Sequence, residues 1–257
     1  MSRMFFDRYA APGALLALLG VAWETCTRAF EVPPWILPAP SQIAQAAVLS
    51  GGTLPEHLRT TLIEAGVGLA IAASLGVAVA LLMANSALAR RVVYPLIVIS
   101  QNVPLIVLAP LLVIWFGFGM LPKVLIVALV GFFPIAVGMT EALLRADPEL
   151  IELVRSMGAS RMQVLRTVRL PGALPAFFAG LRISASYAIF GAVIGEWVGA
   201  SSGLGLFITR SQRAFRTDQV FVAVIVIAAL SIALFYIVGF VARLAMPWQA
   251  ATTEESS

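Results

Sequence analysis

Apolar residues along this chain fall into long runs separated by short polar segments. The runs cover residues 12–30, 60–84, 92–115, 122–143, 174–197 and 219–244. An α-helix rises 1.5 Å per residue, so about 20 residues cross a hydrocarbon core that is roughly 30 Å thick. Each run is long enough to do so. The pattern predicts an all-α, polytopic membrane protein with six transmembrane helices.

The first apolar run follows Arg3 and Arg8, an arrangement that resembles the charged start of a signal peptide. The run is long, however, and contains Glu24. No small-residue cleavage site follows it. We therefore predict a retained helix rather than a removed signal.

Composition agrees with a lipid environment. Hydrophobic residues make up 60% of the chain and charged residues 12%, with a mean hydropathy of +0.96; soluble domains average about 45–50% apolar and about 25% charged. The net charge of +4 comes from arginines in the short segments between runs. With the N-terminus inside, more of these arginines lie on the cytoplasmic side, which predicts that both termini are cytoplasmic. We expect no nucleic-acid binding, because no basic stripe with interleaved aromatic residues occurs.

Few side chains of the types that commonly act in catalysis occur in this chain. Cys26 is the only cysteine, His57 the only histidine and Lys123 the only lysine. A Walker A loop needs a lysine within a Gly-Lys-Ser/Thr sequence, whereas Lys123 follows Pro122 and is predicted at the outer end of its span. We expect no catalytic residues, no metal site and no cofactor in this chain, and no enzymatic activity of its own.

The cytoplasmic segment 142–171 is too long to be a simple turn. Asp147 and Pro148 are typical of a helix start, and Gly158 is typical of a helix end. Between them Leu150, Leu153, Val154 and Met157 recur at helical spacing, which predicts one apolar face. A second short helix is predicted from Ser160 to about Arg169. Two functions fit such an element: a knob that a partner grips, or an interfacial helix that lies on lipid headgroups.

The spacing within this segment resembles a known motif. Glu152-Leu153-Val154, three residues, Gly158, nine residues and Val168-Arg169-Leu170-Pro171 match the "EAA" loop of bacterial ABC-importer permeases, in which two alanines and an isoleucine stand where this chain has Leu153, Val154 and Val168. The resemblance implies a type I ABC importer permease fold, and a coupling helix that docks on a separate ATP-binding subunit. The implied coupling residues are Glu152, Ser156, Met157, Gly158, Ala159 and Ser160, with Leu170 and Pro171 where the chain re-enters the membrane.

Other segments are similar to permeases of the nitrate/sulfonate/taurine family. They are Leu37-Pro38-Ala39-Pro40-Ser41, the run from Ser100 to Gly119, and Gly195-Glu196-Trp197-Val198-Gly199-Ala200 with Gly203-Leu204-Gly205. The residues of the second segment, from Ser100 to Gly119, are more similar to the branch of this family associated with thiamine-precursor pyrimidines or riboflavin.

The resemblance implies a single permease domain over residues 1–257, embedded at about 12–244 and followed by a polar tail at 245–257. It also implies a bacterial inner-membrane location and a second permease copy, giving a homodimer. The other implied partners are two ATP-binding subunits, which hold ATP and magnesium, and an extracytoplasmic binding protein that delivers a small solute.

Polar side chains inside the apolar runs are candidates for a translocation path. These are Gln101, Asn102, Ser184 and Tyr187, together with Glu196 at the outer end of its run. Hydrogen bonding between helices is the alternative interpretation. Two further acids, Glu24 and Glu64, suit either a proton relay or local ion pairs with Arg28 and Arg59. An ion-coupled secondary transporter or a channel is the rival class of function.

Overall fold

The computed structural model describes the backbone of residues 2–248 and the side chains of residues 12–248. In that part of the chain every regular element is a helix. Most of the predicted polar tail lies outside the described residues. The elements are α1 (Ser2–Ala29), α2 (Pro40–Leu49), a 3-10 turn (Ser50–Gly52), α3 (Leu54–Asn85), α4 (Ala87–Ser100), α5 (Leu105–Phe116), α6 (Met120–Leu144), α7 (Pro148–Ser156), α8 (Arg161–Val164), a π-helical turn (Leu165–Arg169), α9 (Leu170–Glu196), α10 (Leu204–Arg213) and α11 (Thr217–Ala245).

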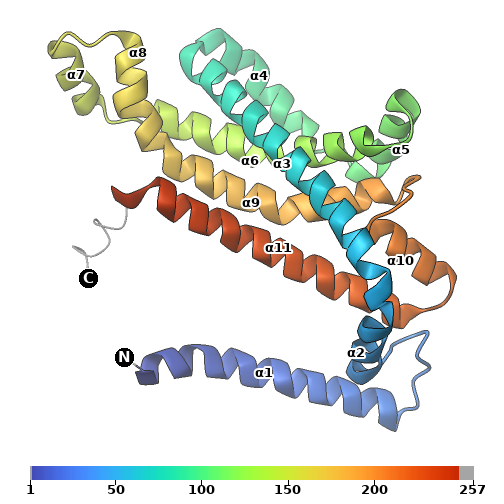
Figure 1. The fold of residues 1–257 in the computed structure, drawn as a ribbon. Helices are drawn as coiled ribbons and strands as arrows, with labels where there is room; N and C mark the ends of the chain where they lie inside the picture. The colour runs from blue at the N-terminus through green and yellow to red at the C-terminus, as the bar shows by residue number, and fades with distance from the viewer. Residues whose placement is uncertain (1, 249–257) are drawn as a thin grey trace.

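Helices α3, α6 and α9 pack closely together and form the centre of the bundle (Figure 1). Glycines permit this close approach. A Cβ atom at Gly68 of α3 would lie 2.4 Å from Cβ of Val127 on α6, and one at Gly180 of α9 would lie 2.7 Å from the carbonyl oxygen of Pro134. Since no side chain fits at either position, the glycines let α3 and α9 approach α6 closely, as in many membrane helix pairs.

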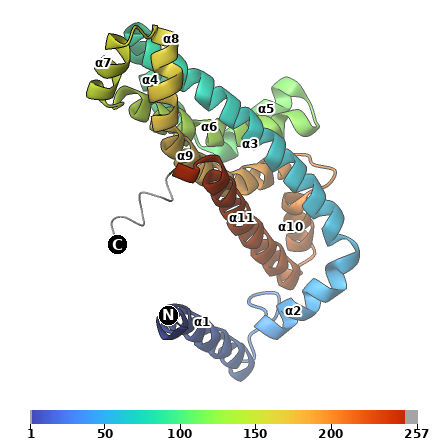
Figure 2. The ribbon, with the colours of Figure 1, turned by 60° about the vertical axis from the view of Figure 1, so that its left-hand side comes forward.

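The remaining helices surround this centre. Helix α11 packs along α9, and α2 and α10 both contact α11. Helix α1 makes its contacts near its C-terminal end, where the ring of Trp23 lies 5.5 Å from that of Phe221 on α11. The rest of α1 stands away from α11 in both views (Figures 1 and 2).

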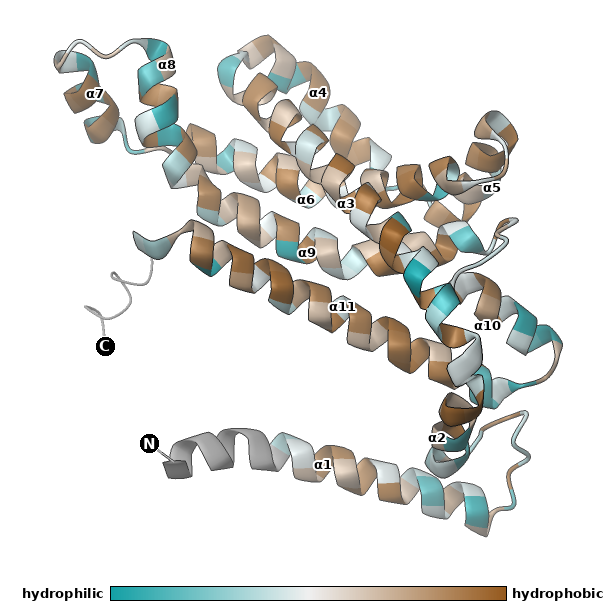
Figure 3. Cartoon of the chain, viewed as in Figure 1, coloured by the Kyte–Doolittle hydropathy of each residue, from teal (hydrophilic) through white to brown (hydrophobic). Residues whose placement is uncertain are grey.

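Four helical stretches among the described residues are long and apolar enough to cross a membrane: Leu54–Asn85, Met120–Leu144, Arg161–Glu196 and Thr217–Ala245. Figure 3 shows hydrophobic residues along these helices and hydrophilic residues gathered on α8 and α10. The pair α4 and α5 forms a fifth candidate. Residues 2–29 form the helix α1 as predicted, but α1 is not among the candidate spans found in the described residues, so the sixth span remains a prediction.

The predicted third span is not one straight helix. Helices α4 and α5 meet at a break over residues 101–104, and their axes differ by 102°. Pro104 explains the break, because proline lacks a donor N–H and disfavours helical geometry at the preceding residue, Val103. The predicted span over 92–115 is therefore a bent pair of helices rather than one straight helix.

The fifth span starts earlier than predicted. Helix α8, the π-helical turn and α9 form one helical stretch from Arg161 to Glu196. The π-helical turn comes immediately before Leu170 and Pro171, where proline cannot donate to the carbonyl one turn back. Residues 161–169 and helix α9 thus form one continuous helical stretch.

Candidate functional site

The element formed by α7, Gly158 and α8 projects from one end of the bundle (Figure 1). The Asp147 carboxylate accepts a hydrogen bond from the backbone N–H of Glu149 at 2.9 Å and caps α7. Gly158 has a φ of +87°, a conformation that L side chains rarely adopt. Ser160 and Gln163 form a capping box at the start of α8. Local hydrogen bonds at each turn make this element well defined.

The tip of this element exposes apolar groups. Met157 is 80% exposed and Leu153 is 57% exposed, whereas Ile151 is buried on the opposite side. Glu152 is also exposed, and the Ser156 hydroxyl donates to the carbonyl oxygen of Leu153 at 2.7 Å. An exposed apolar tip with charged neighbours is typical of a surface that contacts another protein.

The predicted coupling residues separate into two groups. Those from Glu152 to Ser160 lie together on the projecting element. Leu170 and Pro171 are half-buried at the start of α9, where Leu170 packs against a cluster that includes Met139 and Leu143. The second group therefore lies at the base of the element, not at its tip.

A groove of about 670 Å³ runs along the bundle between α6 and α9. Of the predicted path residues, Gln101 and Tyr187 line this groove, together with apolar side chains such as Phe133, Ile183 and Phe190. Among the described residues that line it, none carries a charge. Tyr187 is 51% exposed, so its ring is available to a passing molecule or to a neighbouring chain.

Three predicted path residues lie elsewhere. Ser184 is fully buried, and its hydroxyl contacts the carbonyl oxygen of Gly131 on α6, the interhelical bond that was the alternative interpretation. The Asn102 side chain donates to the carbonyl oxygen of Val98 in the break after α4. Glu196 is 1% exposed and belongs to a polar cluster at the other end of α9.

This polar cluster joins three helices of the bundle. The ammonium Nζ of Lys123 on α6 lies 2.6 Å from Oε1 of Glu64 on α3. Oε1 of Glu196 accepts a hydrogen bond from the Thr61 hydroxyl at 2.6 Å. Lys123, Glu64, Glu196 and Thr61 are all at least nine-tenths buried. Of the alternatives given for Glu64, a local ion pair is present, but its partner is Lys123 and not Arg59.

The same cluster holds the segment between α9 and α10. His57 Nδ1 accepts the backbone N–H of Gly203 at 3.0 Å, and the Thr61 hydroxyl accepts that of Leu204 at 2.9 Å. Oε2 of Glu196 accepts the N–H of Gly205 at 2.6 Å. The backbone N–H groups of residues 203–205 thus each donate to a side chain of α3 or α9.

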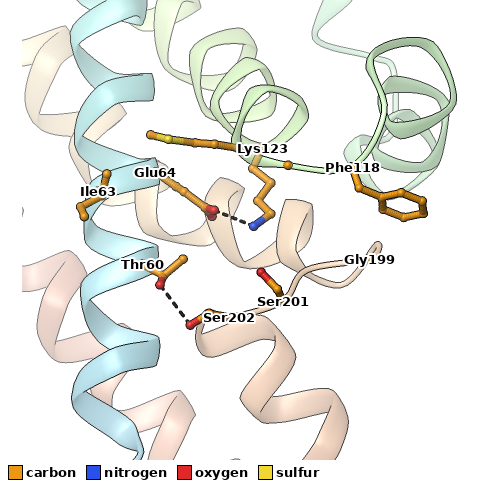
Figure 4. A pocket seen from close by; sticks show the side chains of 10 residues that line it. Thr60, Ile63, Glu64, Phe118, Lys123, Gly199, Ser201 and Ser202 are labelled. Atoms are coloured by element: carbon orange, nitrogen blue, oxygen red, sulfur yellow. Dashed lines mark hydrogen bonds and ion pairs between the residues drawn. The ribbon is translucent and has the colours of Figure 1, made fainter.

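An open cavity of about 470 Å³ lies beside this cluster. Figure 4 shows Lys123 and Glu64 pointing toward one another, with the hydroxyls of Thr60 and Ser202 hydrogen-bonded below them. Sequence reasoning missed this site. The available signal was the i, i+4, i+7 spacing of His57, Thr61 and Glu64, which places three polar side chains on one face of an otherwise apolar helix.

The Glu24 carboxylate binds groups at the end of α1 and the start of α2. It lies 2.6 Å from Nε of Arg28, which confirms the expected pair, and it also accepts the backbone N–H of Ser41 at 3.0 Å. The latter bond ties α1 to the start of α2.

Among the described residues, no group of three or more His, Cys, Asp or Glu side chains is placed to hold a metal ion.

Comparison with known proteins decides the family. Residues 72–248 match the family described as "Binding-protein-dependent transport system inner membrane component". The chain belongs to this family. It is the membrane permease subunit of an ABC importer, an inner-membrane component and not an enzyme.

Named relatives cover most of this permease. It is 36% identical to the formylaminopyrimidine transport permease protein ThiX of Halalkalibacterium halodurans, over 93% of this chain and 95% of that protein. It is 35% identical to the riboflavin transport system permease protein RibX of Chloroflexus aurantiacus, over 97% and 94%. It is 32% identical to the taurine transport system permease protein TauC of Escherichia coli, over 92% and 88%.

The fold is also that of solved importers. An inward-facing structure of the MetNI methionine ABC transporter matches with a TM-score of 0.59 and 25% identity, over 72% of this chain and 94% of that one. The resemblance to permeases expected from the segment 142–171 is therefore confirmed at the level of family and function.

Proposed function

We propose that the α7–Gly158–α8 element is the surface through which this permease couples to its ATP-binding subunit. The contact residues are Glu152, Ser156, Met157, Gly158, Ala159 and Ser160. The observation that carries the proposal is the exposed apolar tip at Met157 and Leu153, held rigid by capped turns. ATP and magnesium belong to the partner, so this chain needs no site for them.

Continuity of the helix gives this contact a mechanical consequence. Because α8 runs into α9 without a break, a displacement of α7 and α8 is passed to Tyr187 in the groove and to Glu196 at the far end. Closure of a dimer of ATP-binding subunits would then rock α9 against α3 and α6. Alternating access driven in this way needs no ion gradient.

We assign the groove to one half of the translocation path, with the other half supplied by a second copy of the permease. The groove is open along one side, and Tyr187 and Phe190 are half-exposed there. The beginning of α1, the α7–α8 element and the end of α11 lie at the same end of the bundle (Figure 1). This arrangement supports a single permease domain with both termini on the cytoplasmic side.

For the solute we propose a flat, uncharged heterocycle delivered by an extracytoplasmic binding protein. Aromatic side chains and one amide, Gln101, line the groove, whereas a sulfonate would favour a cation there. The relatives ThiX and RibX, whose names refer to a formylaminopyrimidine and to riboflavin, support the same class. Transport assays with proteoliposomes should show pyrimidine or flavin uptake, and uptake of taurine instead would contradict this choice.

The coupling proposal is tested by charge reversal. In liposomes, Glu152→Arg should abolish the permease's stimulation of ATP hydrolysis by the ATP-binding subunit. The permease itself should remain folded. Glu56→Arg is the matched control, because Glu56 is an exposed acid in the first turn of α3; that end of α3 lies away from α7 and α8 (Figure 1). Equal stimulation by both variants would rule out the α7–α8 element as the contact.

A further inference from the structure

The buried cluster at the outer end of α9 contains an unbalanced set of charges. It holds two acids, Glu64 and Glu196, but one base, Lys123, which pairs with Glu64. All three are at least nine-tenths buried. A buried carboxylate without a compensating charge is strongly destabilising, and such groups bind a proton or a partner instead.

The other groups near the cluster do not supply the missing positive charge. His57 accepts the Gly203 N–H through Nδ1, so its ring carries a lone pair there and is neutral. Arg210 and Glu56, which act on His57, are opposite in sign and exposed to solvent. The N-terminus of α10 adds about half a positive charge at most.

The hydrogen bonds indicate where the missing charge is compensated. Glu196 is a neighbour of Glu64, because its Oε1 accepts from Thr61, which lies three positions before Glu64 on α3. Oε1 of Glu64 contacts Lys123, but its Oε2 is buried and has no donor. Two adjacent carboxylates repel each other unless one proton lies between them, and that proton would also satisfy Oε2.

We propose that Glu64 and Glu196 share one proton, and that this neutral Glu64–Glu196–Lys123 site holds the segment 199–205 closed. The segment depends on the site directly, since Glu196 accepts the Gly205 N–H and bonds Thr61, which in turn accepts the Leu204 N–H. When the segment leaves the bundle, Glu196 meets water and ionises. The proton passes to water in the cavity lined by Thr60, Ser201 and Ser202.

The proton itself is tested by infrared spectroscopy of the purified full chain at neutral pH. The wild type should show the carbonyl band of a protonated carboxyl group. Both Glu64→Gln and Glu196→Gln should lose it, because the one remaining acid then ionises and balances the charge of Lys123. Glu24→Gln, which alters an ion-paired but partly exposed acid, should keep the band. Absence of the band in the wild type, or its persistence in both single variants, would overturn the proposal.

The link to closure is tested by thiol labelling of Leu204→Cys in a Cys26→Ser background, because position 204 is fully buried while the segment is closed. If opening releases one proton, the opening equilibrium rises about tenfold per pH unit above the release point. The labelling rate should follow that rise, and the rise should disappear when Glu196→Gln is added. The reactivity of the thiol itself is common to both proteins, so equal pH slopes would show that closure does not depend on the shared proton.

A double variant tests whether Lys123 needs one acidic partner in this site. Glu64→Gln with Glu196→Gln leaves Lys123 buried without a carboxylate, and it should unfold at a lower temperature than either single variant. Equal stability of the double and single variants would show that Lys123 needs no acidic partner, contrary to the proposed site.

Discussion

Lys123 and Glu64 form an ion pair between α6 and α3, with 2.6 Å between Nζ and Oε1 and less than a tenth of either side chain exposed. The chain has one lysine, and the fold places it inside the bundle, one turn from the N-terminal end of α6. The Lys123 backbone also contacts Gly195 of α9, where a Cβ atom would lie 3.0 Å from Cα of Lys123. The pair therefore lies where three helices meet.

Removing the cation should destabilise the bundle. Lys123→Met leaves Glu64 buried without its partner, which typically costs about 3–5 kcal/mol. Arg28→Met is the control, because the Arg28–Glu24 pair is largely exposed on the arginine side, and such pairs contribute roughly 0–1 kcal/mol. Thermal unfolding in detergent measures both, and equal losses would contradict the importance of burial.

The glycine contacts between helices make a steric prediction. Gly180→Ala places a Cβ atom against the backbone of Pro134, which cannot move aside, and we expect a loss of about 1–3 kcal/mol. Gly66→Ala has open space around it and should be neutral or stabilising by up to about 1 kcal/mol. Unfolding midpoints of the two variants would show no difference if α6 and α9 were loosely packed.

The turn at Gly158 is predicted to matter for coupling more than for folding. Gly158→Ala forces a side chain into a positive φ, at a local cost of roughly 1–2 kcal/mol, and should misplace the α7 tip. Stimulation of ATP hydrolysis should fall while the yield of folded permease is unchanged. Gly172→Ala, near the start of α9 with open space and no positive φ, is the control and should retain stimulation.

Thr61 is expected to hold the outer segment in place. Thr61→Val keeps the shape of the side chain but leaves the Leu204 N–H and one Glu196 oxygen without a partner, at a cost of about 1–3 kcal/mol for each buried group. Hydrogen exchange of the amides at 203–205 should accelerate. Thr25→Val, which removes an exposed hydroxyl bonded only within its own helix, should leave that exchange unchanged.

The aromatic groove predicts a transport defect without a folding defect. Tyr187→Ala removes a half-exposed ring from the groove and should lower the uptake rate while the unfolding temperature changes little. Tyr236→Ala is the matched control, because Tyr236 is 70% exposed on α11 and does not line the groove. Equal uptake by both variants would remove Tyr187 from the path.

Local features of this permease could be read directly from the sequence. The helix from Pro148, its Asp147 cap and the left-handed Gly158 each depend on residues within a few positions of one another. The long helices also follow from apolar runs, because lipid leaves a backbone no other partner than itself. The family resemblance rested on the same short-range spacing.

The tertiary structure decided which polar groups meet. Glu64 and Lys123 are 59 positions apart, and Thr61 and Glu196 are 135 apart, so no local pattern joins them. For the same reason Ser184 was assigned to a path although it bonds to α6. Helical periodicity fixes the face on which a side chain stands, but only packing determines which helix lies opposite that face. The proton site between Glu64 and Glu196 follows from that packing.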